Sequence, residues 1–206
     1  NASGNLNVSG NLLNYSHMNL SGNGTISGSG TWHNLNYTSI LGDNTNLSIA
    51  NINNHEFIRW AQLLPTASTL TVSGSGAFDN WGTFHVFALA PTSNTLNFTG
   101  PVGLLNHGFF DIFTGPDLQL NGPSYQNGAL SELFIFSGNV NLNVTATTFD
   151  GSLITDAGSH LAFVSTGSHN FASTLGLEGN FIFDGGTFTG EINQPATSNI
   201  DIAAAT

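Results

Sequence analysis

An internal repeat constrains the fold of this chain more than any other feature of its sequence. The segment LTVSGSGAFDNWGTFHVF, residues 70–87, aligns without a gap with LNFTGPVGLLNHGFFDIF, residues 96–113. Leucine, glycine, asparagine and phenylalanine recur at the same places in both segments. Units this short cannot enclose a core alone, and they are typical of proteins in which each repeat stacks on its neighbours.

The same plan extends with lower fidelity in both directions. Residues 47–136 hold the clearest units, and weaker openings occur within 4–46 and 139–190. From Val8 to Leu142, six steps average about 22 residues. We therefore predict a single domain over residues 1–206 with about nine units, in which 191–206 forms a C-terminal tail or end strand.

Within each unit, the local pattern is that of short β-strands. Apolar residues alternate with polar ones, as in the Leu-x-Val and Leu-x-Phe openings, and glycine, asparagine, serine and proline separate these runs. Residues 54–64 have apolar side chains at helical spacing, but they align with a strand-forming segment downstream, so we expect a strand. The sequence predicts an all-β parallel β-helix, or β-solenoid, of about nine coils of roughly 22 residues, with little or no α-helix.

The same model predicts where recurring side chains lie. Stacked coils place equivalent residues about 4.8 Å apart along the axis. We expect the recurring phenylalanine, leucine, isoleucine and valine to form inward ladders. The recurring asparagine is expected to form an internal or corner ladder of side-chain amides.

The pattern L-x-L-x-G followed by N-x-G-x-F resembles a known group of repeat proteins. It is similar to the right-handed parallel β-helix of repetitive bacterial surface proteins, such as autotransporter passenger domains and filamentous-haemagglutinin-like adhesins. The resemblance covers roughly residues 4–190. It implies secretion, an extended shape and a role in adhesion, surface display or fibre formation, and it carries no catalytic residues.

Charge and composition exclude several classes of partner. Only 6% of residues are charged, against about 25% in ordinary soluble proteins, and Arg59 is the only basic side chain apart from histidine, in a chain of net charge −11. Nucleic-acid binding requires several lysines or arginines, so nucleic acid is a poor partner. No run of apolar residues is long enough to span a bilayer, so membrane insertion is not expected. Low charge, abundant asparagine, serine, threonine and glycine, and a single possible trypsin site at Arg59 suit a protease-rich exterior, so we expect an extracellular or cell-surface location.

Candidate catalytic and metal-binding residues do not converge in the predicted coils. His55 and His107 occupy equivalent positions two coils, or about 10 Å, apart, which is too far for one metal site. Asp111 aligns with His85, and Glu132 falls near the same strand, whereas Arg59 belongs to another coil. We therefore expect no catalytic, cofactor-binding or metal-binding residues.

One modification has a visible sequence signal. N-x-S/T sequons begin at nine asparagines, and seven of them precede residue 50. These candidate N-glycosylation sites are Asn1, Asn7, Asn14, Asn19, Asn23, Asn36, Asn46, Asn97 and Asn143.

Three functions are compatible with this sequence. The leading hypothesis is a non-enzymatic extracellular structural or adhesive protein that forms a cell-surface fibre or filament by head-to-tail self-association, with other copies of itself and host or environmental glycans as partners. The second is a β-helical carbohydrate-active enzyme, a polysaccharide hydrolase or lyase. The third is a pilin-like β-sandwich subunit that uses strand donation, which predicts antiparallel strand pairing.

Overall fold

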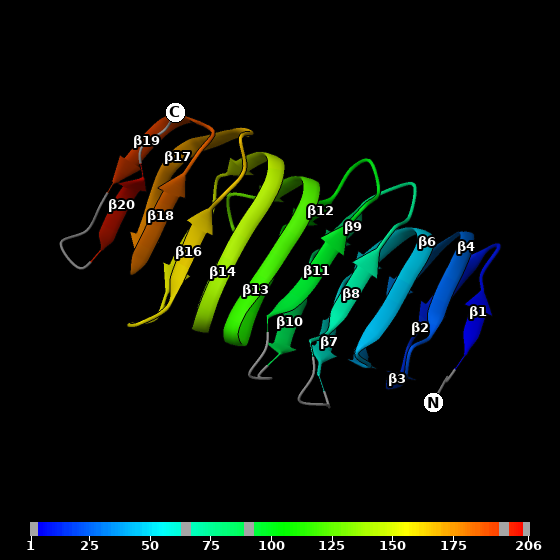
Figure 1. The fold of residues 1–206 in the computed structure, drawn as a ribbon. Helices are drawn as coiled ribbons and strands as arrows, with labels where there is room; N and C mark the ends of the chain where they lie inside the picture. Colours follow the sequence, from blue (N-terminus) through cyan, green and yellow to red (C-terminus); the bar gives the residue numbers. More distant parts are fainter. Residues whose placement is uncertain (1–3, 63–66, 89–92, 194–197, 204–206) are drawn as a thin grey trace.

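The chain folds as a parallel β-solenoid. The computed structural model describes residues 4–62, 67–88, 93–193 and 198–203. Successive coils stack along one axis, with β1 and β20 at opposite ends of the stack (Figure 1). There are about eight turns of about 22 residues, and the described residues contain no helix.

Each coil contributes to three parallel sheets, which we number in the order in which the chain first enters them. Sheet 1 consists of β1 (Asn5–Asn7), the first parts of β4 (Thr25–Asn34) and β6 (Asn44–Asn54), β8 (Thr69–Val72), β11 (Asn94–Phe98), the middle of β13 (Phe109–Asn127) and β14 (Glu132–Phe149), β16 (His160–Phe163), β18 (Asn180–Asp184) and β20 (Asn199–Ala203).

Sheets 2 and 3 complete the coil. Sheet 2 consists of β2 (Asn11–Asn14), the ends of β4 and β6, β9 (Phe78–Asn80), β12 (Leu104–Asn106), the ends of β13 and β14, the start of β17 (Ser168–Glu178) and the start of β19 (Thr187–Asn193). Sheet 3 consists of β3 (Met18–Ser21), β5 (Tyr37–Leu41), β7 (Phe57–Ala61), β10 (Thr83–Ala88), the starts of β13 and β14, β15 (Ser152–Thr155) and the ends of β17 and β19.

These pairings decide between the structural predictions. Phe84 pairs with Phe110 in parallel, as the gapless repeat requires. Within the segment at 54–64, Phe57–Ala61 forms strand β7, which confirms the strand prediction there, and residues 63 and 64 lie outside the described residues. The pilin-like β-sandwich alternative is wrong, because the strand pairs of the described chain run parallel. The coils number about eight rather than nine, and two of them are 26 residues long.

The asparagine repeat forms a buried ladder at the corner between sheets 2 and 3. The side-chain amide of each member donates to the carbonyl oxygen of the next, at N–O distances between 2.6 and 2.8 Å. Each amide nitrogen also donates to a backbone carbonyl at the start of sheet 3 in the following coil. Every member therefore satisfies its polar groups without water, as burial demands. The members of this amide ladder are Asn14, Asn34, Asn54, Asn80, Asn106 and Asn127.

Two of the ladder asparagines, Asn80 and Asn106, are followed two residues later by a glycine, and at both glycines the backbones of successive coils approach closely. A Cβ atom on Gly108 would collide with the carbonyl oxygen of Gly82, and one on Gly82 would collide with that of Glu56. Two features thus explain the N-x-G sequence of these two units. The asparagine amide joins the ladder, and the glycine leaves room for a backbone carbonyl oxygen of the preceding coil.

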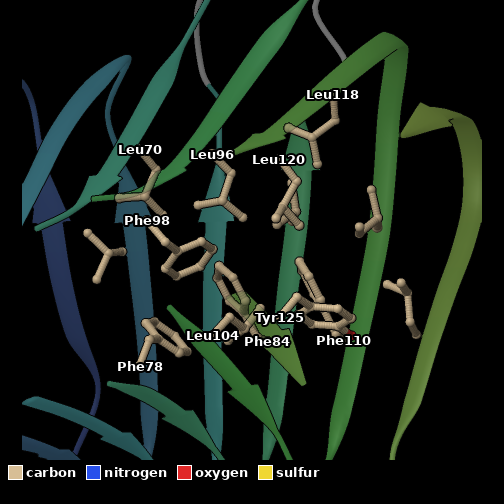
Figure 2. Close-up of a cluster of buried hydrophobic side chains, with 14 of the residues drawn as sticks. Leu70, Phe78, Phe84, Leu96, Phe98, Leu104, Phe110, Leu118, Leu120 and Tyr125 are labelled. Carbon is tan, nitrogen blue, oxygen red and sulfur yellow. The ribbon is translucent and has the colours of Figure 1, made fainter. Parts of the chain in front are cut away.

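Apolar side chains of all three sheets meet inside the coil in vertical columns. Figure 2 shows Leu70, Leu96 and Leu120 side by side in one row and Phe84 beside Phe110 in another. The rings of Phe84 and Phe110 stack with centroids 5.1 Å apart and planes 14° from parallel. These inward columns confirm the predicted ladders for the aromatic residues that are buried in the core.

Candidate functional site

The outward side of sheet 3 is unusual, because it carries aromatic side chains. In β10, Phe84 and Val86 point into the core, so His85 and Phe87 point outward. The same alternation on neighbouring strands gives a surface that we call the aromatic face. Its residues are His17, Tyr37, Phe57, Arg59, His85, Phe87, Phe109, Asp111, Phe113, Glu132, Phe134 and Phe136.

Six of the sixteen phenylalanines lie on this face, which corrects the expectation that phenylalanine stacks inward. The expectation failed because the last residue of the repeated unit was treated as part of the core. Phe87 and Phe113 stand three residues after inward-facing Phe84 and Phe110, and an odd separation in a strand leads to the opposite side. A strict reading of the period of two would have found the aromatic face.

The rings of the aromatic face form one continuous path along the solenoid. Eight rings follow one another with centroid separations between 3.8 and 5.9 Å, from His17 near β3 to Phe134 on β14. Phe113 and Phe136 stack with centroids 4.2 Å apart and planes 6° from parallel. All these rings retain solvent contact, and Phe109 beside them is 52% exposed.

A column of ionisable groups crosses the middle of the aromatic face. Arg59, His85 and Asp111 lie side by side on β7, β10 and β13, one per coil and in direct register. The Arg59 guanidinium carbon lies 4.8 Å from the centre of the Phe87 ring, within the range of a cation–π interaction. The Nε atom of Arg59 is buried and has no hydrogen-bond partner among the described residues.

The surrounding rings change the protonation of this column. Partial burial, followed by the charge of Glu132, raises the pKa of Asp111 to about 6. Burial, followed by the charge of Arg59, lowers the pKa of His85. Both shifts disfavour the charged form of a group that has lost water. The Asp111 carboxyl is therefore partly protonated near pH 6, and His85 is neutral at pH 7.

The structure also places the other sequence-derived candidates. It brings Asp111, Glu132, His85 and Arg59 onto one face, although they come from four coils. Asp79 lies on sheet 2, where its carboxylate is 3.6 Å from the His107 imidazole. His107 in turn stacks on Trp81, with centroids 4.3 Å apart, and His55 stacks on His33, with centroids 6.2 Å apart. Both His55 and His107 are exposed. No group of three or more metal-binding side chains occurs in the described part of the chain.

The sequons occupy several environments. Asn1 lies outside the described residues. Asn14 is 7% exposed and is the first member of the amide ladder, with its nitrogen donating three hydrogen bonds, so this atom is inaccessible in the folded chain. The others keep some solvent contact, and glycosylation at them stays a prediction; they are Asn7, Asn19, Asn23, Asn36, Asn46, Asn97 and Asn143.

None of the described residues forms a helix able to cross a bilayer. A hollow of about 310 Å³ borders the aromatic face, between Asn36 and Tyr37 of one coil and Glu56 and Phe57 of the next.

Comparison with protein-family models, with curated proteins and with solved structures finds no match for this chain.

Proposed function

We propose that this chain is a non-enzymatic structural rod of an extracellular or cell-surface fibre and that its aromatic face is the surface through which it assembles. The observation that carries the proposal is the path of eight solvent-contacting rings on sheet 3. Soluble monomers rarely leave contiguous apolar patches in water, and such patches mark interaction sites.

The composition of the face supports a contact with protein. Phenylalanine, tyrosine and arginine are enriched where proteins meet, and the only arginine of the chain is on this face. The resemblance to repetitive bacterial surface proteins supports the extracellular location and the adhesive role. Binding of glycans to the same rings remains part of the proposal.

Contact through the aromatic face is lateral, whereas the sequence led us to expect head-to-tail stacking. The two modes differ in electron micrographs of the purified chain. Lateral assembly widens the particles beyond one solenoid, and end-to-end stacking lengthens them at constant width. Head-to-tail association stays a prediction beside the lateral one.

The test compares the chain with a variant that carries Phe113→Ser and Phe136→Ser, which removes two stacked rings and so interrupts the ring path. Leu13→Ser is the matched control, because Leu13 is 46% exposed on sheet 2. We expect assemblies in sedimentation velocity for the unmodified chain and the control, and monomers for the double variant. Equal assembly of all three would contradict the proposal, provided that circular dichroism shows them folded.

A second candidate function is supported by one observation, the paired acids on the aromatic face. A carboxyl group with a pKa of about 6 beside a second carboxylate is suited to be the general acid of a polysaccharide hydrolase. Asp111 would donate the proton, and Glu132 would be the partner carboxylate. Release of reducing ends from soluble polysaccharides, lost in Asp111→Asn, would establish this activity. No release above that of Asp111→Asn would exclude it for the glycans assayed.

A further inference from the structure

The arrangement of charges on the aromatic face is complementary to itself. Arg59 lies one coil before His85, and Asp111 lies one coil after it, at the same position along their strands. Consider a second copy of the chain, rotated by 180° about an axis that runs parallel to β10 and passes over His85. Each residue of the rotated copy keeps its position along the strand direction, but the coil before β10 and the coil after β10 change places. Such a rotation therefore moves the site of Arg59 onto that of Asp111.

We propose that the aromatic face binds the aromatic face of a second copy of this chain, with the two solenoids antiparallel and related by a twofold axis along β10 at His85. The inference rests on the proposed function and specifies its partner. Two reciprocal ion pairs would form, each between Arg59 of one copy and Asp111 of the other. An isologous contact of this kind closes on itself as a dimer.

The same rotation aligns the rings. Phe57 is in register with Thr83 and, one coil further, with Phe109, so Phe57 of one copy meets Phe109 of the other. Phe87 lies on β10 itself and therefore meets Phe87 of the second copy near the axis. Aromatic contacts occupy both flanks of the ion pairs and would exclude water from them.

Arg59 and Asp111 each lack, within one chain, the partner that the second copy provides. They are two coils, or about 10 Å, apart, and no ion pair to Arg59 occurs within the described residues. The buried Nε of Arg59 has no acceptor, and the carboxyl of Asp111 has Glu132 as its charged neighbour. Leaving a partly desolvated charge unpaired is costly, and a second copy would remove that cost at both residues.

The groups around the axis tolerate this arrangement at neutral pH. The ionisable groups that face Asp111 are His85 on β10 and Glu132 on β14. His85 has a lowered pKa, so two copies of it meet at the axis without charge repulsion. The net charge of −11 on each chain opposes association, but at about 0.15 M salt charges beyond roughly 8 Å are screened.

The test uses two charge-reversal variants, Arg59→Asp and Asp111→Arg, in about 0.15 M salt at pH 7.5. Each variant alone places like charges at both pairs, so we expect dimerisation weaker by on the order of 100-fold for each. In an equimolar mixture, a heterodimer places the two acidic groups of the first variant against the two arginines of the second. We expect the mixture to form heterodimers of nearly the original affinity, measured by sedimentation equilibrium.

The outcomes separate this inference from the proposed function. Absence of any self-association in the unmodified chain would overturn both. Association that depends on Phe113 and Phe136, but that neither reversal weakens and mixing does not restore, would overturn only the antiparallel pairing. If a reversed variant fails to fold, Arg59→Gln and Asp111→Asn serve instead, and unchanged dimer affinity in both would equally contradict the inference.

A cross-link provides an independent readout, because the chain contains no cysteine. His85→Cys places one thiol per chain next to the proposed axis, and a short bis-maleimide should join two copies in high yield. Asn97→Cys on sheet 1 is the control, and its two copies should not be joined by the cross-linker. Equal cross-linking of the two variants would count against an axis at His85.

Discussion

The amide-ladder coils and the coils that follow them build the same corner from different chemistry. From Asn14 to Asn127, the corner between sheets 2 and 3 is filled by hydrogen-bonded amides. In the next two coils, the equivalent positions are Phe149 and Phe171, whose rings stack with centroids 5.6 Å apart. A stacked coil therefore requires only that vertical neighbours match, and either hydrogen bonds or rings can supply the match.

Where the ladder ends, buried polar side chains occur two residues earlier in the strand. Tyr125 is in register with Thr147, and Thr147 with His169. The Tyr125 hydroxyl donates to the carbonyl oxygen of Asn127, the last ladder amide. Thr147 and Ser165 hydrogen bond to the two ring nitrogens of the fully buried His169. The amide-ladder coils thus hold groups that do not titrate, and the later coils hold one that does.

The largest expected effect concerns the ring stack. Phe149→Ala removes a fully buried ring that contacts Tyr125, Phe163 and Phe171, and should lower the free energy of unfolding by about 4 kcal/mol. Urea unfolding measures the loss. Phe109→Ala, at a half-exposed ring, is the control and should cost less than about 1 kcal/mol. Equal losses would mean that the later coils do not depend on their interior rings.

The next largest effect concerns the amide ladder. Asn80→Ala removes one hydrogen bond from each of the buried groups of Asn54, Asn106 and Phe109, and we expect a loss of about 3 kcal/mol in the free energy of unfolding. The matched control is Asn121→Ala, in a partly exposed amide row with Asn97 and Asn143, where water replaces the lost bonds. A cost below about 1 kcal/mol at Asn80, or the same cost at both, would show that burial does not strengthen the ladder.

A smaller effect separates the two regions by pH. Burial lowers the pKa of His169 below 6.5, so between pH 6.5 and that lower value the unfolded chain binds more protons than the folded one. Stability from this residue is therefore complete above pH 6.5 and is lost as the pH falls. At pH 5.5, the loss is at most about 1.4 kcal/mol.

Asp111 acts in the opposite direction, because its raised pKa makes the folded chain bind more protons between pH 3.8 and about 6. The comparison that isolates His169 is therefore with His169→Phe, which keeps Asp111 and places a ring beside Phe188. The melting temperature of the unmodified chain should fall further between pH 7.5 and pH 5.5 than that of the variant. Identical losses in both would contradict a neutral, buried His169.

The sequence was sufficient for the fold and insufficient for the candidate site. Alternating apolar residues and the gapless repeat predicted parallel coils, and the recurrent asparagine predicted the ladder. Leu47 and Ile49 both point inward, and the structure pairs Leu47 rather than Ile49 with Val72. A shift of two residues keeps the same side of a strand inward, so apolar spacing alone cannot detect it.

The cluster of ionisable groups on the aromatic face could not be predicted from the sequence, for a different reason. Arg59, His85, Asp111 and Glu132 are far apart in sequence, and only the register of four coils brings them together. The raised pKa of Asp111 depends in turn on burial among rings that were assigned to the core. Neither effect is visible until the outward side of each strand is known.

The vertical register underlies the amide ladder, the aromatic face and the proposed dimer, and paired cysteines test it directly. Thr71 and Asn97 are register partners on the outside of sheet 1, with Cα atoms about 4.8 Å apart, which suits a disulfide. Thr71 and Thr95 are offset by two residues, or about 8 Å, which does not. Cysteine pairs at Thr71 and Asn97 should oxidise readily within one chain, whereas those at Thr71 and Thr95 should stay reduced. Equal oxidation of both pairs, or of only the offset pair, would contradict the account.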